Sequence, residues 1–175
     1  MSPEIVERIR KIKVVLIDND GVLTDGRIVL GDYGDELKFF DVQDGLGLVL
    51  LHRAGLPVVI ISGKKSRINP RRARDTRAAK LYQNVPDKLK IFEKVLKKYR
   101  ITAQEACYIG DDLLDAPPMT RAGFSVAVAN AVPEVKQKAH YVTQRPGGRG
   151  GVREVADLLL KTQDKWAKAT ERYFV

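Results

Sequence analysis

The chain has 175 residues, of which 44% are hydrophobic and 30% are charged, and it contains one cysteine. This length predicts a single domain over residues 1–175, and the composition is typical of a soluble globular protein. The amino terminus is charged throughout and the longest apolar runs are short, so we expect neither a signal peptide nor a membrane span. A single cysteine argues against an internal disulfide and favours the reducing cytoplasm.

The formal net charge of +9 favours anionic partners, either small acidic substrates or nucleic acid. The densest basic run, "GKKSRINPRRARDTRAAK" (63–80), contains no aromatic residue and so lacks the stacking platform of a single-strand binder. We interpret this run as a solvated helix face. A substrate-facing wall and a nucleic-acid surface remain as alternatives, and nucleic acid is the least favoured.

Apolar β-branched runs alternate along the chain with stretches of helical periodicity. Strands are predicted over residues 12–18, 56–62, 105–111 and 124–129. Helices are predicted over residues 44–55, 88–99, 114–123 and, broken at most once, 152–174. This alternation predicts an α/β fold, a Rossmann-like doubly wound parallel sheet with helices on both faces. A β-hairpin flap is expected after the first strand, at about residues 26–41.

Polar side chains follow three of the predicted strands. Asp18 and Asp20 end the first, Ser62 ends the second, and Asp111 and Asp112 end the third. The carboxyl ends of parallel strands meet at one edge of a sheet, where ligands bind. Like charges about 4 Å apart cost around 4 kcal/mol per pair at an effective dielectric near 20, so the cluster needs a cation. Oxygen ligands alone favour Mg²⁺.

The stretch "DNDGVLTDGRIV" (18–29) has two other possible interpretations. A calcium loop of the EF-hand type needs glycine sixth and glutamate twelfth, but Gly21 is fourth and Val29 is twelfth. A strand-capping turn with solvated carboxylates remains the simpler alternative, because turns favour Asp and Gly. Three strand ends with polar groups at one edge favour a functional site over that alternative.

Four motifs in order resemble the haloacid dehalogenase-like phosphatase superfamily. They are "DNDGVLTDG" (18–26), "IISGK" (60–64), Lys88 within "LYQNVPDKLKIFEKVL" (81–96), and "YIGDDLLDAPPM" (108–119). The later segment "PGGRGGVREV" (146–155) is similar to the capless branch that acts on 3-deoxy-D-manno-octulosonate 8-phosphate. The resemblance covers nearly the whole chain and implies a Mg²⁺-dependent phosphatase of a small sugar-acid phosphate in the lipopolysaccharide precursor pathway.

The resemblance also implies catalytic roles. Asp18 would be the nucleophile that forms an aspartyl-phosphate, and Asp20 would be the general acid and base. The expected Mg²⁺ ligands are Asp18, the backbone carbonyl of Asp20, and Asp111. Asp112 and Asp115 would support the metal site.

Phosphate-binding and substrate-binding groups follow from the same motifs. The phosphoryl oxygens would be held by Ser62, the backbone N–H of Gly63, and Lys88. The predicted contacts to the rest of the substrate are Asp25, Gly26, Lys64 and Arg72. Three residues depart from the branch pattern: Lys64 replaces a usual arginine and loses its bidentate geometry, Pro70 enters the next helix, and Asn84 replaces a glycine.

The segment between Gly21 and Pro57 is too short for a separate cap domain. A lone hairpin is marginal in water, and this one carries apolar residues on both faces. The resemblance implies a homo-oligomer, a tetramer, in which neighbouring copies cover the site with help from the tail near Tyr173 and Phe174.

Three alternative functions stay open. One is a phosphatase of nine-carbon sialic-type acid phosphates, and another is a polynucleotide or protein phosphatase, which the basic surface permits. The third is an inactive oligomerisation domain. Intact Asp18, Asp20, Lys88 and Asp111 argue against that last reading.

Overall fold

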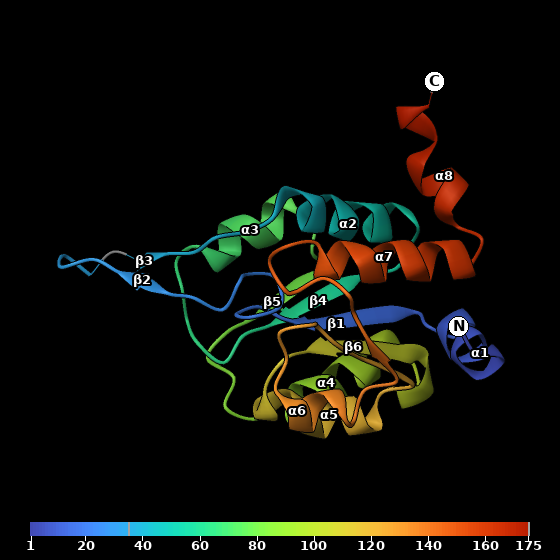
Figure 1. The fold of residues 1–175 in the computed structure, drawn as a ribbon, viewed down its shortest axis with the longest axis horizontal. Coiled ribbons are helices and arrows are strands. Elements are labelled where there is room, and N and C mark those ends of the chain that lie inside the picture. Colours follow the sequence, from blue (N-terminus) through green and yellow to red (C-terminus); the bar gives the residue numbers. More distant parts are fainter. Residues whose placement is uncertain (35, 175) are drawn as a thin grey trace.

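The structure is a computed structural model that describes residues 1–34 and 36–174. Its centre is a six-stranded parallel sheet in the order β5-β4-β1-β6-β7-β8 (Figure 1). The strands of this sheet are β1 (Val14–Asp18), β4 (Val58–Ile61), β5 (Lys80–Tyr82), β6 (Ala106–Gly110), β7 (Phe124–Ala127) and β8 (Tyr141–Val142).

The four central strands are buried along their whole length. A strand covered on both faces by helices needs apolar residues at every position, which explains the continuous runs "VVLID" and "VVII". These strands confirm the parallel core that the sequence predicted. The pairing of Asp18 with Ile61, and of Ile17 with Ile109, brings three strand ends to one edge.

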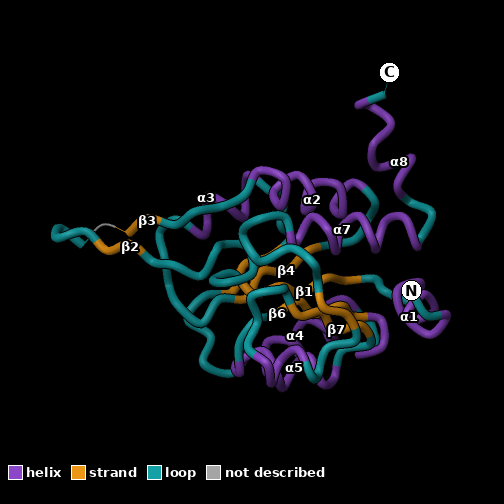
Figure 2. The backbone as a smooth tube through the Cα atoms, in the orientation of Figure 1, coloured by secondary structure: helices purple, strands orange, loops and turns teal. Residues whose placement is uncertain are grey.

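Helices cover both faces of the sheet, as Figure 2 shows with strands lying between two helical layers. One layer contains α2, α3 and α7, and the other contains α4, α5 and α6 (Figure 1). The helices are α1 (Pro3–Arg10), α2 (Val42–Arg53), α3 (Asn69–Asp75), α4 (Lys88–Tyr99), α5 (Ala116–Arg121), α6 (Pro133–Lys136), α7 (Gly151–Thr162) and α8 (Trp166–Thr170). The doubly wound α/β prediction is therefore confirmed.

The expected break in the carboxyl-terminal helix lies between α7 and α8. Asp164 has a φ of 56°, a left-handed conformation that commonly ends helices and that aspartate adopts more readily than most residues other than glycine. Four elements were not predicted: α1, α6, β5 and β8. Strands β5 and β8 are short edge strands with no fully buried residue, so they lack the apolar run that identifies the central strands.

A small antiparallel sheet follows β1. It pairs β2 (Val29–Leu30) with β3 (Glu36–Leu37), and an isolated bridge joins Thr24 to Phe40 nearer the body. This hairpin projects away from the main sheet (Figure 1). Within residues 1–34 and 36–174, no helix combines the length and apolar character that a membrane span requires.

Candidate active site

Three acidic side chains gather where β1 and β6 end. Asp18 is the last residue of β1, Asp111 follows β6, and Asp115 closes the turn after it. Each offers a carboxylate oxygen that lies within 4.8 Å of the others. Asp18 is 6% exposed and Asp115 is fully buried, so their charges are shielded from water and interact strongly.

Lys88 supplies a cation to this cluster from the first turn of α4. Its Nζ donates to Asp18 Oδ1 and to Asp115 Oδ1, each at 2.7 Å. Lys88 is only 4% exposed. Burial alone would lower the pKa of Lys88, but the two carboxylates outweigh burial and raise the pKa above its ordinary value. Lys88 is therefore a permanent buried cation between two carboxylates.

Asp115 has both oxygens occupied by protein donors. Its Oδ1 accepts from the Tyr108 hydroxyl at 2.8 Å as well as from Lys88. Its Oδ2 accepts from the backbone N–H groups of Asp111 at 3.1 Å and Asp112 at 3.4 Å. A carboxylate with this many donors is fixed in place, so Asp115 is suited to hold Lys88 and the Asp111 loop.

Asp111 differs from Asp115 in having a free oxygen. Its Oδ1 is buried and has no hydrogen-bond partner. Burial, followed by the charge of Asp115, raises the pKa of Asp111 to about 7. Burial and Asp115 likewise raise the pKa of Asp18 well above its usual range. The protein on its own therefore disfavours the ionised form of both groups.

These groups fit a bound Mg²⁺. When all three carboxylates are ionised, the single Lys88 ammonium leaves two negative charges uncompensated, which a divalent cation would offset. The partnerless oxygen of Asp111 offers a ligand. Gly21 gives Asp111 the room that it needs: a Cβ there would lie 2.0 Å from Asp111 Oδ2, and the φ of +100° suits glycine. Hard oxygen ligands of this kind are those that Mg²⁺ prefers.

A pocket of about 230 Å³ opens onto the cluster. Most of the predicted site residues line it, together with two apolar side chains. The lining residues are Asp18, Asp20, Gly26, Ile28, Gly63, Lys64, Lys88, Asp111, Asp112 and Leu114. The structure thus brings together residues from all four sequence motifs.

Four predicted residues lie outside that lining: Asp115, whose hydrogen bonds are described above, and Ser62, Asp25 and Arg72. Ser62 is fully buried and its hydroxyl donates to the Lys64 carbonyl at 2.9 Å. Asp25 pairs with Arg27 at 2.6 Å. Arg72 donates to the Asp41 carbonyl at 2.6 Å, and its guanidinium lies 5.0 Å from the centre of the Phe40 ring. Arg72 therefore supports the base of the hairpin in this structure.

One residue of the site was missed by sequence reasoning. Lys38 follows β3, and its Nζ lies 2.6 Å from Asp20 Oδ1. The pattern "ELKF" holds the signal that could have found it, because a period of two sets Lys38 opposite the apolar Leu37 and Phe39. The sequence does not indicate whether the Lys38 face or the face of Leu37 and Phe39 points toward the body of the protein.

The glycine-rich segment before α7 braces the loop that follows Asp18. Gly148 N–H donates to the Val22 carbonyl at 2.9 Å, and Gly147 N–H donates to Asn130 Oδ1 at 2.6 Å. Asn130 in turn donates to the Gly21 carbonyl at 2.9 Å. A Cβ on Gly147 would lie 1.9 Å from that same carbonyl oxygen. The close backbone approach explains why glycines occupy this segment.

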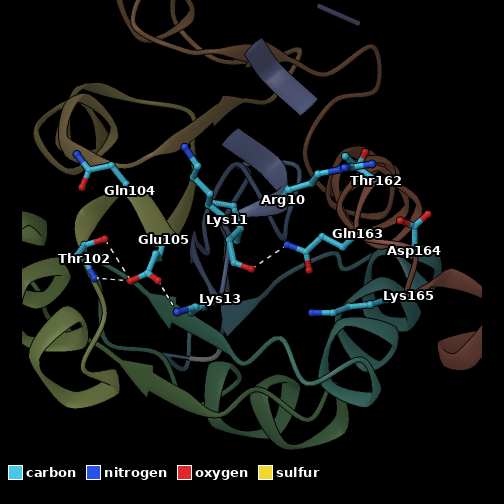
Figure 3. A pocket seen from close by; sticks show the side chains of 11 residues that line it. Arg10, Lys11, Lys13, Thr102, Gln104, Glu105, Thr162, Gln163, Asp164 and Lys165 are labelled. Atoms are coloured by element: carbon cyan, nitrogen blue, oxygen red, sulfur yellow. Dashed lines mark hydrogen bonds and ion pairs between the residues drawn. The ribbon is translucent and has the colours of Figure 1, made fainter. Parts of the chain in front are cut away.

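A larger pocket, of about 700 Å³, lies at the opposite edge of the sheet, where Lys13 precedes β1 (Figure 3). The basic residues that line it are Arg10, Lys11, Lys13 and Lys165. Glu105 is bonded there to Thr102 and paired with Lys13, and does not join a carboxylate cluster. In this molecule the larger of these two pockets is therefore not the one that contains the carboxylate cluster.

Comparison with known proteins agrees with the geometry. Residues 74–155 match the family model described as haloacid dehalogenase-like hydrolase. The 3-deoxy-D-manno-octulosonate 8-phosphate phosphatase of Yersinia pestis is 42% identical over 97% of this chain and 91% of its own length.

Solved structures give the same result. The crystal structure of the Yersinia pestis phosphatase has a TM-score of 0.93 at 42% identity, covering 95% of this chain and 90% of that chain. The Moraxella catarrhalis phosphatase, in complex with magnesium ion, phosphate ion and a KDO molecule, has a TM-score of 0.95 at 36% identity, covering 99% of each chain. The chain belongs to the haloacid dehalogenase-like hydrolases, in the branch of the 3-deoxy-D-manno-octulosonate 8-phosphate phosphatases.

Proposed function

We propose that this chain is a Mg²⁺-dependent phosphatase that hydrolyses 3-deoxy-D-manno-octulosonate 8-phosphate through an aspartyl-phosphate on Asp18. The observation that carries the proposal is Lys88, buried between Asp18 and Asp115 beside the free oxygen of Asp111. All 175 residues form one phosphatase domain in this proposal. The names of the most similar relatives support the substrate.

The first step transfers the phosphoryl group to Asp18. Lys88 holds Asp18 Oδ1, so Oδ2 is the oxygen available to attack phosphorus. As the new bond forms, the bond from phosphorus to the sugar oxygen breaks, and Asp20 gives its proton to that oxygen. The backbone N–H of Gly63 and the Lys88 ammonium stabilise the phosphoryl oxygens. The Ser62 hydroxyl would join them after turning away from the Lys64 carbonyl.

The second step releases phosphate. A water molecule attacks the phosphorus of the aspartyl-phosphate and gives a proton to Asp20, which restores the acid for the next cycle. Asp18 leaves as a free carboxylate. One residue, Asp20, serves both steps in this proposal, because it lines the pocket next to Asp18.

The residues that would hold Mg²⁺ are Asp18, Asp111 and the backbone carbonyl of Asp20, with Asp112 and Asp115 supporting them. When bound, Mg²⁺ offsets the charges of these carboxylates and of the phosphoryl oxygens. Asp112 caps its own turn, its Oδ1 accepting from Leu113 N–H at 2.7 Å. That bond fixes the turn from which Asp111 and Asp115 both emerge.

Lys64 is the residue that we assign to the sugar-acid carboxylate. It lines the pocket and is exposed, so a substrate carboxylate could reach it without displacing a protein partner. Asp25 and Gly26 lie at the base of the hairpin and are assigned to the sugar hydroxyls. Arg72 stays in the proposal as a group that would act after leaving the Asp41 carbonyl.

We also propose that the chain works as a homo-oligomer, a tetramer. The hairpin exposes Leu30 by 77% and Leu37 by 57%, and the tail exposes Phe174 by 80%. Exposed apolar groups of this size favour burial against another copy. The hairpin and α8 both project from the body in Figure 1, where neighbouring copies can reach them. The buried Cys107 thiol supports our placement in the cytoplasm.

A substrate panel tests the function. Purified protein with Mg²⁺ is incubated with 3-deoxy-D-manno-octulosonate 8-phosphate, a nine-carbon sialic-type acid 9-phosphate, a phosphopeptide and a 5′-phosphorylated oligonucleotide, and released phosphate is measured. We expect the eight-carbon substrate to have the highest kcat/KM and Asp18→Asn to abolish all release. Preference for another member would reassign the substrate. Activity that persists in Asp18→Asn would overturn the mechanism.

A further inference from the structure

Lys38 connects the hairpin to the catalytic edge. Its Nζ lies 2.6 Å from Asp20 Oδ1 and 3.3 Å from Glu36 Oε1. The Lys38 side chain is completely buried, whereas Leu37 and Phe39 on either side of it are 57% and 58% exposed. A buried ammonium loses its hydration and needs carboxylate partners in return. The two carboxylates therefore determine where this lysine lies.

The arrangement reverses the usual pattern of a surface hairpin. Side chains alternate between the faces of a strand, and in a solvated hairpin the charged ones face water. Here Leu37 and Phe39 face outward, while Glu36 and Lys38 face the body. Of these two inward charges, Lys38 contacts Asp20 and Glu36 contacts Lys38.

The two oxygens of Asp20 are not equivalent. Oδ1 accepts from Lys38 at 2.6 Å and from Asn19 Nδ2 at 3.0 Å. Oδ2 has one long contact, 3.4 Å from the Ser62 hydroxyl. Asp20 lines the pocket but Lys38 does not, so Lys38 reaches the carboxylate from outside the substrate space. Oδ1 is anchored and Oδ2 remains available to the substrate.

We propose that Lys38 is a positioning residue, which holds Asp20 Oδ1 so that Oδ2 faces the leaving oxygen of the substrate. This inference rests on the proposed function, in which Asp20 is the general acid. As the bond from phosphorus to the sugar oxygen breaks and the bond to Asp18 forms, the proton on Oδ2 passes to the departing oxygen. Asp20 is left as a carboxylate that still accepts from Lys38 through Oδ1.

If Lys38 positions Asp20, the effect of removing Lys38 on the rate of phosphoryl transfer should depend on the leaving group of the substrate. An alkoxide such as the sugar oxygen needs a proton as it departs, but p-nitrophenolate is stable as an anion and does not. Loss of Lys38 should therefore slow phosphoryl transfer from the sugar phosphate, with little effect on transfer from p-nitrophenyl phosphate. A lysine that only kept the hairpin closed would affect both substrates alike.

The experiment compares Lys38→Met with the wild-type protein in single-turnover measurements with Mg²⁺. The two probes are 3-deoxy-D-manno-octulosonate 8-phosphate and p-nitrophenyl phosphate, and the first release of each alcohol is followed. We expect about a 10- to 100-fold loss for the sugar phosphate, as for a misplaced general acid, with KM nearly unchanged. The control is Lys90→Met, which removes an 81% exposed lysine and should leave both rates intact.

Two further variants complete the test. Lys38→Arg keeps an N–H donor and should restore much of the sugar-phosphate rate, and Lys38→Gln is the second loss variant if the methionine variant fails to fold. Equal losses on both probes, or no loss, would overturn the inference while the phosphatase stands. A wild-type protein that releases neither alcohol would instead overturn the proposed function.

Discussion

The two regions that meet at Asp20 are built in opposite ways. At the edge of the main sheet, Asp18, Lys88 and Asp115 are almost completely buried and bonded to one another. In the hairpin, the strands are two residues long, and Leu30 is 77% exposed. The reacting groups lie in the buried and hydrogen-bonded edge of the main sheet, which we call the rigid region, and the hairpin contributes one buried cation, Lys38. The chemistry is therefore placed where burial and hydrogen bonds fix the side chains.

The largest effect on the rigid region is expected when its buried cation, Lys88, is removed. Lys88→Met should lower kcat by about 10³-fold, because phosphoryl charge is no longer offset, and should destabilise the metal-free fold by about 3–5 kcal/mol. Phosphate release and urea unfolding measure the two effects. Lys90→Met, on the same helix, should change neither. Wild-type activity in Lys88→Met would contradict the role of the buried lysine.

Replacing one glycine of positive φ in each region allows the two regions to be compared directly. Gly148→Ala places a Cβ 2.3 Å from the carbonyl carbon of Thr24, whereas Gly34→Ala at the hairpin tip meets no atom within 4 Å. The hairpin variant should cost about 1–2 kcal/mol from backbone strain alone. The Gly148 variant should cost clearly more and reduce activity, because the loop after Asp18 must shift. Equal unfolding free energies would show that the glycine segment does not brace that loop.

Binding of Mg²⁺ should depend on pH in the rigid region. The pKa of Asp111 is raised to about 7, so a proton must leave before the metal binds. Loss of the Asp111 proton alone should raise the affinity by up to about tenfold per pH unit below that pKa, and the raised pKa of Asp18 adds to this rise. Without metal, the raised pKa of this acid means that its contribution to stability is present at low pH and is lost as the pH rises toward 7. Calorimetric titrations from pH 6 to pH 8 test this, and a flat affinity would contradict it.

The smallest effect on folding is expected in the hairpin. Leu30→Lys should change the unfolding free energy of the isolated protomer by less than about 0.5 kcal/mol, because the side chain is exposed there. The same change should dissociate the proposed oligomer, since it places a charge in the apolar contact. Light scattering measures the mass. A wild-type protein that is already a monomer would contradict the proposal that neighbouring copies cover the active site.

The sequence predicted the rigid region well because its signals are local. Continuous apolar runs identified the central strands, and polar residues at their ends identified the cluster of Asp18 and Asp111. Asn84, which stands where a glycine is usual, has a φ of 56°, a conformation that asparagine adopts more readily than most residues.

Other features could not be predicted because they depend on distant contacts. The inward turn of Lys38 depends on which face of the hairpin meets the body. The engagement of Arg72 by the Asp41 carbonyl depends on the packing of α3 against the hairpin base. The brace of Gly147 on the Gly21 loop joins segments more than 100 residues apart, and periodicity carries no such information.

The central claim is that Asp18 accepts the phosphoryl group, and a crystal structure with Mg²⁺ and beryllofluoride tests it most directly. The account predicts beryllium bonded to Asp18 Oδ2, the metal in contact with Asp18 and Asp111, and Lys88 still bonded to Asp18 Oδ1. Beryllofluoride on another residue, or an Asp18 carboxylate turned away from the pocket, would contradict the account.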